Sequence, residues 1–288
     1  MNGILLMDKP QGWTSHDVVA KLRGALHERR IGHAGTLDPM ATGLLVVFVG
    51  KATKAVEFAE ADRKRYVAGL RLGLTTDTQD TTGNVLSEAA VSFDAGQLDR
   101  VLFGFVGEIE QIPPMYSAIK IDGQRLYKIA RKGQTVERPA RRITIHSLKR
   151  VAPLENNETS LEVCCSKGTY VRTLCADIGE ALGCGGAMSA LRRTESGAFR
   201  VEDAYTVEKI LELAACGRAE EALLPVHNLF AACEAVTADA AQERLVRNGC
   251  PFETALPAET YRVMSEAGEF LMLGSSDGCR MSSVKNFF

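Results

Sequence analysis

Residues 32–45 read GHAGTLDPMATGLL, and this stretch decides how the rest of the chain is interpreted. Its glycines adopt backbone angles that other residues avoid, and Pro39 disfavours a helical conformation at the residue before it. Asp38 is therefore predicted to occupy a stiff, non-helical turn. The apolar run at 44–49 is rich in β-branched residues and bounded by glycines, which is typical of a fully buried strand. A carboxylate at the mouth of such a strand is well placed for catalysis.

The same turn has a plain structural interpretation. An Asp-Pro pair beside glycines often forms a turn in which the carboxylate bonds its own backbone. Turn chemistry alone favours this interpretation over catalysis. The assignment of Asp38 therefore needs a second line of evidence.

That evidence is a family pattern, G-H-x-G-x-L-D-P-x-A-T-G, which the stretch matches at all nine fixed positions. The pattern resembles the signature loop of the bacterial-type tRNA pseudouridine-55 synthases, the TruB family of uridine isomerases. The resemblance implies that Asp38 is the catalytic nucleophile and that His33 contacts the target nucleotide. It further implies isomerisation of uridine to pseudouridine at position 55, in the T-loop of tRNA, on a flipped-out base and without a cofactor.

A second motif lies at residues 167–172, which read KGTYVR and precede apolar residues at helical spacing. It resembles the family's K-G-T-Y-[IV]-R segment, in which the arginine pairs with the catalytic aspartate and the tyrosine contacts the substrate. These roles fall on Arg172 and Tyr170. An arginine at a helix start can hold a carboxylate by two hydrogen bonds and keep its pKa low. Structural salt bridges use the same geometry, so the motif is informative only together with Asp38.

Three further residues take roles from the resemblance. Tyr66, at the start of a strand predicted for 65–74, would stack on the target uracil and take part in removing its C5 proton, with Arg172 helping to acidify the phenol. An aromatic residue at a strand start otherwise packs in the core. Leu191 lies in an L-R-R segment and would contact the flipped base. Lys9 lies in a D-K-P-x-G turn and would lie near the active site, although its residue type alone predicts a solvated side chain.

Basic residues concentrate in one segment, although the formal net charge of the chain is −2. Between residues 120 and 142, eight basic residues stand against two acidic ones. This is expected of a segment that meets phosphates, although a solvated basic face has the same composition. Residues 111–120 resemble the family's Q-x-P-P-x-Y-S-A-x-K segment, and the resemblance implies a thumb insertion at about 111–142 that closes over the RNA arm. The residues expected to contact the RNA backbone are Lys120, Arg125, Lys128, Arg131 and Lys132.

The element pattern predicts an α+β fold. A mixed, mainly antiparallel sheet with flanking helices is expected in residues 1–232, and short alternating runs suggest a small β-rich module at 233–288. The resemblance identifies these parts as a pseudouridine synthase catalytic domain and a PUA-like RNA-binding module. From residue 231 onward, however, eight acidic residues outnumber five basic ones, which departs from an RNA-binding surface.

The composition narrows the class of protein. A content of 45% hydrophobic and 24% charged residues is ordinary for a globular protein. No apolar run approaches the roughly 18 residues of a membrane span, and the first residues lack a signal-segment pattern. The eight cysteines form no C-x-x-C pair, so reduced thiols are expected and no metal site. We expect a cytoplasmic monomer that binds the tRNA T-arm and needs no membrane, metal, cofactor or protein partner.

Two other functions were weighed against the isomerase. A non-catalytic RNA-binding protein with the same fold would need no Asp38, so an intact set of Asp38, Tyr66 and Arg172 argues for an enzyme. A zinc-dependent base deaminase would need H-x-E and P-C-x-x-C ligands, which are absent from the sequence. For the isomerase, attack of Asp38 on C1′, attack on C6 and assistance of glycal formation all remain open.

Overall fold

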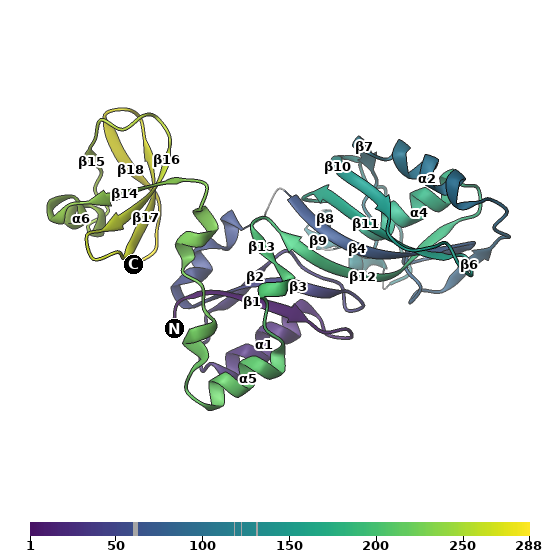
Figure 1. The fold of residues 1–288 in the computed structure, drawn as a ribbon, viewed down its shortest axis with the longest axis horizontal. Coiled ribbons are helices and arrows are strands. Elements are labelled where there is room, and N and C mark those ends of the chain that lie inside the picture. The colour runs from purple at the N-terminus through teal and green to yellow at the C-terminus, as the bar shows by residue number, and fades with distance from the viewer. Residues whose placement is uncertain (60–62, 118, 122, 131) are drawn as a thin grey trace.

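A nine-stranded sheet runs through the larger part of the chain in this computed structural model, which describes residues 1–288 except 60–62, 118, 122 and 131 (Figure 1). Its strands are β1 Gly3–Lys9, β2 Ile31–Ala34, β3 Thr42–Val49, β4 Arg63–Leu72, β7 Gly107–Gln111, β10 Arg141–Arg150, β11 Glu158–Ser166, β12 Gly186–Ser196 and β13 Phe199–Arg200. Their order is β1-β3-β12-β4-β11-β10-β7, with β2 paired to β3 and β13 paired to β12. The β3–β12 pair is parallel, and the other pairs of this sheet are antiparallel.

Helices cover the two ends of this sheet. Near β1 and β3, α1 and α5 pack into one apolar core, whereas α2 and α4 pack against β4, β10 and β11 in another (Figure 1). The helices are α1 Ser15–Ala25, α2 Ala95–Gly104, α3 Leu126–Ala130, α4 Val171–Ala181, α5 Val207–Ala215 and α6 Ala240–Arg247, with 3₁₀ turns η1 Gly50–Phe58, η2 Val201–Asp203, η3 Ala219–Ala222 and η4 Val226–Phe230. Two small hairpins pair β5 Leu74–Thr76 with β6 Val85–Glu88 and β8 Lys120–Ile121 with β9 Gln124–Arg125.

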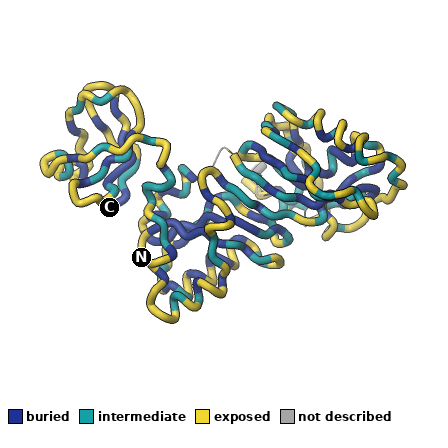
Figure 2. The backbone as a smooth tube through the Cα atoms, viewed as in Figure 1, coloured by how far each residue is buried: buried dark blue, intermediate teal, exposed yellow. Residues whose placement is uncertain are grey.

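Strand β3 is covered on both of its faces. Leu45 and Val47 pack in the core shared with α1 and α5, whereas Leu44 and Phe48 pack in a second apolar cluster on the other side. Every residue of β3 after Thr42 is buried, as the dark blue trace in Figure 2 illustrates. A strand buried on both faces reads as a continuous apolar run. The fully buried strand predicted at 44–49 is thereby confirmed.

The C-terminal part forms a separate five-stranded sheet with its own core around Tyr261, Val263 and Met281. Its strands, in the order β14-β16-β17-β18-β15, are β14 Glu234–Ala238, β16 Thr260–Ser265, β17 Phe270–Ser276, β18 Arg280–Asn286 and β15 Phe252–Glu253. This sheet joins the first part of the chain through aromatic rings, since Phe230 lies 5.8 Å from Phe287 between ring centroids. The predicted α+β class, mainly antiparallel with a β-rich C-terminal part, is confirmed.

Apolar spacing in the sequence predicts helices at 51–61 and 123–133, and both differ from the observed elements. The helix expected at 123–133 is limited to α3, because Gly123 adopts a positive φ of 78° in the turn between β8 and β9. The helix expected at 51–61 is the 3₁₀ helix η1, and the last two predicted residues lie outside the described residues. Local apolar spacing identified both segments, but it did not distinguish a hairpin or a 3₁₀ turn from an α-helix.

The parallel pairing of β3 with β12 depends on Gly43. This residue lies opposite Arg193 with a positive φ of 96°. A Cβ atom at Gly43 would lie 2.3 Å from the Arg193 carbonyl oxygen, so only glycine permits this approach. The turn that carries Asp38 is thereby attached directly to β12.

We predict that Gly43→Ala lowers the free energy of unfolding more than Gly12→Ala does. Both positions have positive φ, which costs alanine about 1–2 kcal/mol. Only at Gly43 does the new Cβ also meet backbone atoms, whereas nothing lies within 4 Å of it at Gly12. Urea unfolding of the two variants measures the difference. Equal losses would contradict the role given to the β3–β12 contact.

Candidate active site

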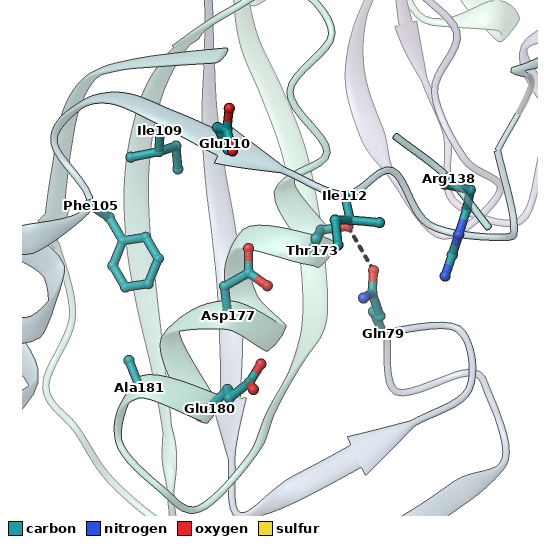
Figure 3. Close-up of a pocket in the computed structure, with 10 residues that line it drawn as sticks. All are labelled: Gln79, Phe105, Ile109, Glu110, Ile112, Arg138, Thr173, Asp177, Glu180 and Ala181. Carbon is teal, nitrogen blue, oxygen red and sulfur yellow. Dashed lines mark hydrogen bonds between the residues drawn. The ribbon is translucent and has the colours of Figure 1, made fainter. Parts of the chain in front are cut away.

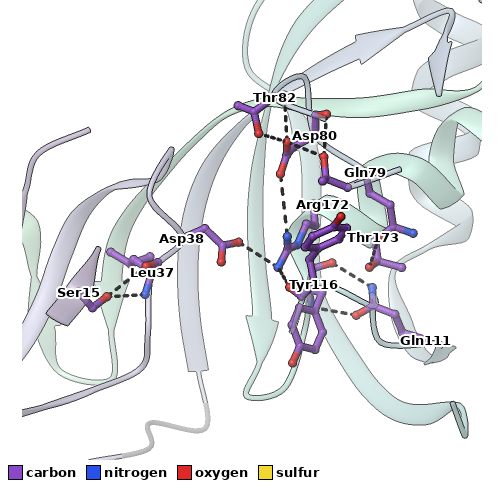
Figure 4. A network of polar contacts seen from close by, with 12 residues as sticks. Ser15, Leu37, Asp38, Gln79, Asp80, Thr82, Gln111, Tyr116, Arg172 and Thr173 are labelled. Carbon is purple, nitrogen blue, oxygen red and sulfur yellow. Dashed lines mark hydrogen bonds and ion pairs between the residues drawn. The ribbon is translucent and has the colours of Figure 1, made fainter. Parts of the chain in front are cut away.

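Asp38 lies in the turn between β2 and β3. Leu37 and Ala41 are buried on either side of it and anchor the turn. The Ser15 hydroxyl accepts a hydrogen bond from the Leu37 amide at 2.9 Å and donates one to the Leu37 carbonyl at 3.1 Å (Figure 4). The Asp38 side chain remains 39% exposed. The turn is therefore fixed by its neighbours, while its carboxylate stays accessible to a substrate.

Arg172, in the first turn of α4, faces Asp38 (Figure 4). Its Nη2 atom lies 3.2 Å from Asp38 Oδ2 and donates to the Tyr116 carbonyl at 2.6 Å. Its Nη1 atom lies 3.9 Å from Asp80 Oδ2. The pairing with Asp38 is present, but through one nitrogen rather than through a two-pronged contact. The guanidinium is instead shared among three segments of the chain, which together fix its position.

Asp80 is a site residue that sequence reasoning missed, because it lies outside the matched family patterns. The residue is buried, and its Oδ1 atom accepts three hydrogen bonds. The donors are the Thr78 hydroxyl at 2.9 Å, the Thr82 amide at 3.0 Å and the Thr82 hydroxyl at 2.6 Å. The sequence signal that could have identified Asp80 is a threonine two residues before it and another two residues after it. They orient the carboxylate so that Oδ2 faces Arg172.

The pKa of Asp38 is raised above its ordinary value. Burial of the carboxyl is the main cause, and the negative charge of Asp80 adds to it. The positive charges of Arg172 and Lys9 oppose the shift without cancelling it. The expectation that Arg172 keeps this pKa low is therefore wrong, because Arg172 is shared with a second carboxylate and its charge does not outweigh the partial burial of Asp38.

Tyr66 and Leu191 lie on one face of the sheet, on neighbouring strands β4 and β12. The register pairs Tyr66 with Arg193, and side chains two residues apart on a strand share a face. Tyr66 is buried, and Leu191 packs against the same apolar cluster, which also contains Leu37. Burial raises the pKa of Tyr66, and the guanidinium of Arg193 opposes the shift. The sequence had pointed to Arg172 for this influence, and the structure assigns it to Arg193.

His33 and Tyr170 are both partly exposed. His33 lies on β2, where burial and the charge of Arg193 lower its pKa, so that the ring is neutral at pH 7. Its Nδ1 atom has no hydrogen-bond partner within the described part of the chain. Tyr170 precedes α4, and its amide donates to Gln111 Oε1 at 2.8 Å. Gln111 thereby fixes the backbone from which Arg172 extends.

Lys9 is completely buried, so the expectation of a solvated side chain is wrong. Its Nζ atom donates to the carbonyls of Pro10 at 2.9 Å and Trp13 at 2.6 Å, and lies 3.4 Å from the Pro39 carbonyl. Burial lowers its pKa to about 8, and the charge of Asp38 opposes this shift. Lys9 therefore lies near Asp38, as the resemblance implied. Its Nζ atom faces the carbonyl of Pro39, the residue that follows Asp38.

The basic segment is joined to the site through its backbone. The Tyr127 amide on α3 donates to the Ser117 carbonyl at 3.1 Å, next to the Tyr116 carbonyl that Arg172 holds. Leu126 is buried, whereas Arg125, Lys128 and Lys132 are exposed. Arg131 and the side chain of Lys120 lie outside the described residues. The described basic side chains are thus exposed on a segment whose backbone is bonded to residues next to Arg172.

A separate pocket of about 610 Å³ lies between β7 and α4 (Figure 3). Its apolar wall includes Phe105 and Ile109, and its acidic rim includes Glu110, Asp177 and Glu180. Burial and the charge of Glu180 raise the pKa of Asp177 to about 6. Such a rim repels phosphate, so this pocket does not fit an RNA backbone.

The basic residues of the C-terminal sheet are mostly engaged. Arg247 pairs with Glu243 and Glu269, and Lys285 lies 2.6 Å from Glu57 of the first part of the chain. Arg262 donates to the Cys233 carbonyl at 2.9 Å. These contacts hold the sheet together and attach it to its neighbour. They leave few positive charges available for phosphates on this part of the surface.

Among the residues that the structure describes, no cluster of three or more histidine, cysteine, aspartate or glutamate side chains could hold a metal ion. The eight cysteines are free thiols, and four of them are buried. No described helix is both long enough and apolar enough to cross a bilayer.

Comparison with known proteins agrees with this geometry. Residues 23–171 match the N-terminal domain of the TruB family of pseudouridylate synthases, and residues 172–256 match the tRNA pseudouridylate synthase B C-terminal domain. The chain belongs to the TruB family of pseudouridylate synthases. Formation of pseudouridine in tRNA is therefore the activity of this chain.

Curated relatives share most of the chain. The tRNA pseudouridine synthase B of Ralstonia nicotianae is 46% identical over 276 residues, which is 93% of this chain and 87% of the relative. The tRNA pseudouridine synthase B of Clostridium perfringens is 40% identical over 285 residues, which is 96% of each protein. A solved Cbf5-Nop10-Gar1 complex contains a chain of similar fold, with a TM-score of 0.76 and 26% identity, over 99% of this chain and 85% of that one.

We predict that Asp38→Asn stabilises the fold at pH 7. Because the pKa of Asp38 is raised on folding, its charged form at neutral pH costs stability, and this cost disappears as acid protonates the group. A neutral asparagine avoids the cost. Thermal unfolding at pH 7 should therefore show a higher melting temperature for the variant, with the difference shrinking toward pH 4.

Asp17→Asn is the matched control, for which the expected change in stability at pH 7 has the opposite sign. Hydrogen bonds from Thr14 lower the pKa of Asp17, so its charged form favours the folded state at neutral pH. This variant should lose stability at pH 7. A loss for Asp38→Asn as well would mean that the ion pair with Arg172 outweighs burial.

Proposed function

We propose that the chain converts uridine to pseudouridine in tRNA, at position 55 of the T-loop, with Asp38 as the nucleophile. The observation that carries this proposal is an accessible carboxylate in a rigid turn, paired with the buried guanidinium of Arg172 beside Tyr66 and Leu191. A buried arginine on a partly exposed carboxylate orients the reacting oxygen. The tRNA substrate is inferred from the names of the curated relatives.

The reaction breaks the N1–C1′ bond, turns the base and joins C5 to C1′. Attack of Asp38 on C1′, attack on C6 and assistance of glycal formation all require its ionised form. Arg172 and Lys9 favour that form against the burial that raises its pKa. A raised pKa also makes the carboxylate a stronger nucleophile once it is ionised, since nucleophilicity rises with basicity.

The target base must leave its stack to reach Asp38. Flipping costs a few kcal/mol, and stacking on an aromatic ring returns roughly 1–3 kcal/mol. We infer that Tyr66 supplies this stacking surface, with Leu191 as an apolar contact on the same sheet face. His33 and Tyr170 are partly exposed and would contact the nucleotide.

The RNA arm would lie along the thumb. Arg125, Lys128 and Lys132 are exposed on the segment whose backbone reaches Arg172 through Tyr116. A T-arm recognised by shape and phosphate charge needs such a surface and no base-specific contact. We infer that the C-terminal sheet adds mainly shape, because three of its five basic side chains are engaged within the protein. We further infer that one chain is sufficient for the reaction.

The activity test uses Asp38→Asn and unmodified tRNA without added cofactor. Asparagine keeps the size of the side chain but lacks the nucleophilic charge, so no pseudouridine should form. Affinity for tRNA should stay within about tenfold, because Asp38 would face the target uracil and would not contact the phosphates that dominate RNA affinity. Single-turnover assays and filter binding measure both quantities. Appreciable product from the variant would remove Asp38 from the nucleophile's role.

The thumb test replaces Arg125, Lys128 and Lys132 together with glutamine. Each lost phosphate contact should lower the slope of log affinity against log salt by roughly 0.7–0.9. Lys209→Gln is the control, since Lys209 lies on α5 and pairs with Glu212 on the protein surface. It should leave the slope unchanged. The same slope for the triple variant and wild type would locate the RNA elsewhere.

A further inference from the structure

Arg193 is a buried cation in the middle of β12. Its side chain is among the largest that are fully buried, with the residue 1% exposed. Nε donates to the Leu44 carbonyl at 2.7 Å and Nη2 donates to the Gly35 carbonyl at 2.8 Å. Within the described residues, no carboxylate lies at ion-pair distance from it, whereas the adjacent Arg192 is paired with Asp8. Its positive charge is thus held only by neutral groups.

A buried charge without a charged partner lowers the stability of the fold. Burying a charge without a charged partner is costly, and backbone carbonyls compensate it only in part. An apolar side chain of similar length would fill the same space without that cost. The charge must therefore act on something within the site, and the neighbours of Arg193 identify it.

Tyr66 is that neighbour. The two residues are cross-strand partners in the β4–β12 register, so their side chains lie on the same face of the sheet, and the Arg193 guanidinium opposes the burial that raises the pKa of Tyr66. The register shifts between Arg193 and Glu195, so a β-bulge follows the pair immediately. Bulges beside active sites re-aim the adjacent side chain. Arg193 also holds Gly35, three residues before Asp38, and so connects the phenol to the turn that carries the nucleophile.

We propose that Arg193 is a positioning residue that holds the Tyr66 hydroxyl and stabilises its phenolate while Tyr66 gives its proton to N1 of the uracil and later takes a proton from C5. This inference rests on the proposed function. It deepens that function by assigning the group that makes a buried tyrosine usable in proton transfer.

The proton transfer balances without an outside reagent. When the N1–C1′ bond breaks, N1 keeps the electron pair, and the phenol donates its proton there. Turning the base about its C6–N3 line exchanges the places of N1 and C5, so the phenolate then faces C5. The C5=C6 electron pair then forms the bond from C5 to C1′. C1′ is either electron-deficient after the loss of N1 or, where Asp38 has attacked it, releases the Asp38 carboxylate with its electron pair. The C5–H bond breaks next, its electron pair restores the C5=C6 double bond, and the proton returns the phenolate to phenol. Arg193 faces the oxygen throughout.

A double-mutant cycle with Arg193→Lys and Tyr66→Phe tests the proposal. Single-turnover pseudouridine formation should fall at least about tenfold in Arg193→Lys and at least about a hundredfold in Tyr66→Phe, the usual scale for a lost acid–base group. The double variant should be no slower than Tyr66→Phe, because Arg193 acts through the hydroxyl. Additive losses would reduce Arg193 to a clamp on Gly35 and Leu44.

A substrate deuterated at C5 of the target uridine provides a second readout. Weakening the proton acceptor should make cleavage of the C5–H bond more rate-limiting, so the isotope effect should increase in Arg193→Lys. Arg192→Lys, on the adjacent residue, should leave the isotope effect at the wild-type value, because Arg192 pairs with Asp8 and not with Tyr66. An unchanged isotope effect in Arg193→Lys would overturn the proposal.

If Arg193→Lys does not fold, 3-fluorotyrosine at position 66 replaces it in the test with Arg193 intact. Fluorination makes the phenol more acidic, so the isotope effect should change if the hydroxyl carries the proton. An isotope effect equal to that of wild type would overturn the proposal. Failure of the proposed function can be distinguished from failure of the Arg193 proposal, because the wild-type protein would then form no pseudouridine in tRNA.

Discussion

The close contact between Gly43 and the backbone of Arg193 is the constraint on which the site depends. It permits β3 to run parallel beside β12 in a sheet whose other pairs are antiparallel. A side chain at Gly43 would meet the Arg193 carbonyl and push the strands apart. Because the contact exists, the turn before β3 and the side chains of β12 lie together, although about 150 residues separate them in the chain.

Charge in this site is arranged around one shared guanidinium. Arg172 binds Asp38 through one nitrogen and faces the buried carboxylate of Asp80 through the other. Threonine donors hold Asp80, and Gln111 holds the backbone before α4. Asp38 is therefore positioned by an arginine that is itself positioned from several directions. This is the support that a catalytic group needs, since small displacements of a reacting atom cost large factors in rate.

The basic segment and the candidate site are connected through backbone hydrogen bonds rather than through a continuous basic surface. The basic thumb reaches the site where the Tyr116 carbonyl accepts from Arg172, and α3 is bonded to the adjacent Ser117. RNA bound along the thumb would thus bear on the residue that orients Asp38. The C-terminal sheet differs, because aromatic rings such as Phe230 and ion pairs such as Lys285 with Glu57 attach it to the protein. Its acidic balance suits a structural support more than a phosphate-binding surface.

The sequence by itself determined the elements and the turn that carries Asp38. Periodicity, glycine and proline act within a few residues, so the buried strand at 44–49 and the α+β class were predictable, and the family patterns identified Asp38, Tyr66 and Arg172. Only the tertiary structure decided the electrostatics. Lys9 is buried rather than solvated, and the pKa of Asp38 is raised rather than lowered.

The roles of Asp80 and Arg193 also came from the tertiary structure alone. Each depends on which distant segments exclude water around a charge and which donors they bring to it. Desolvation and Coulomb interactions depend on distances across the fold, and no local pattern in the sequence encodes those distances. A sequence therefore names the reactive groups, and the fold sets how strongly each of them is charged, held and exposed.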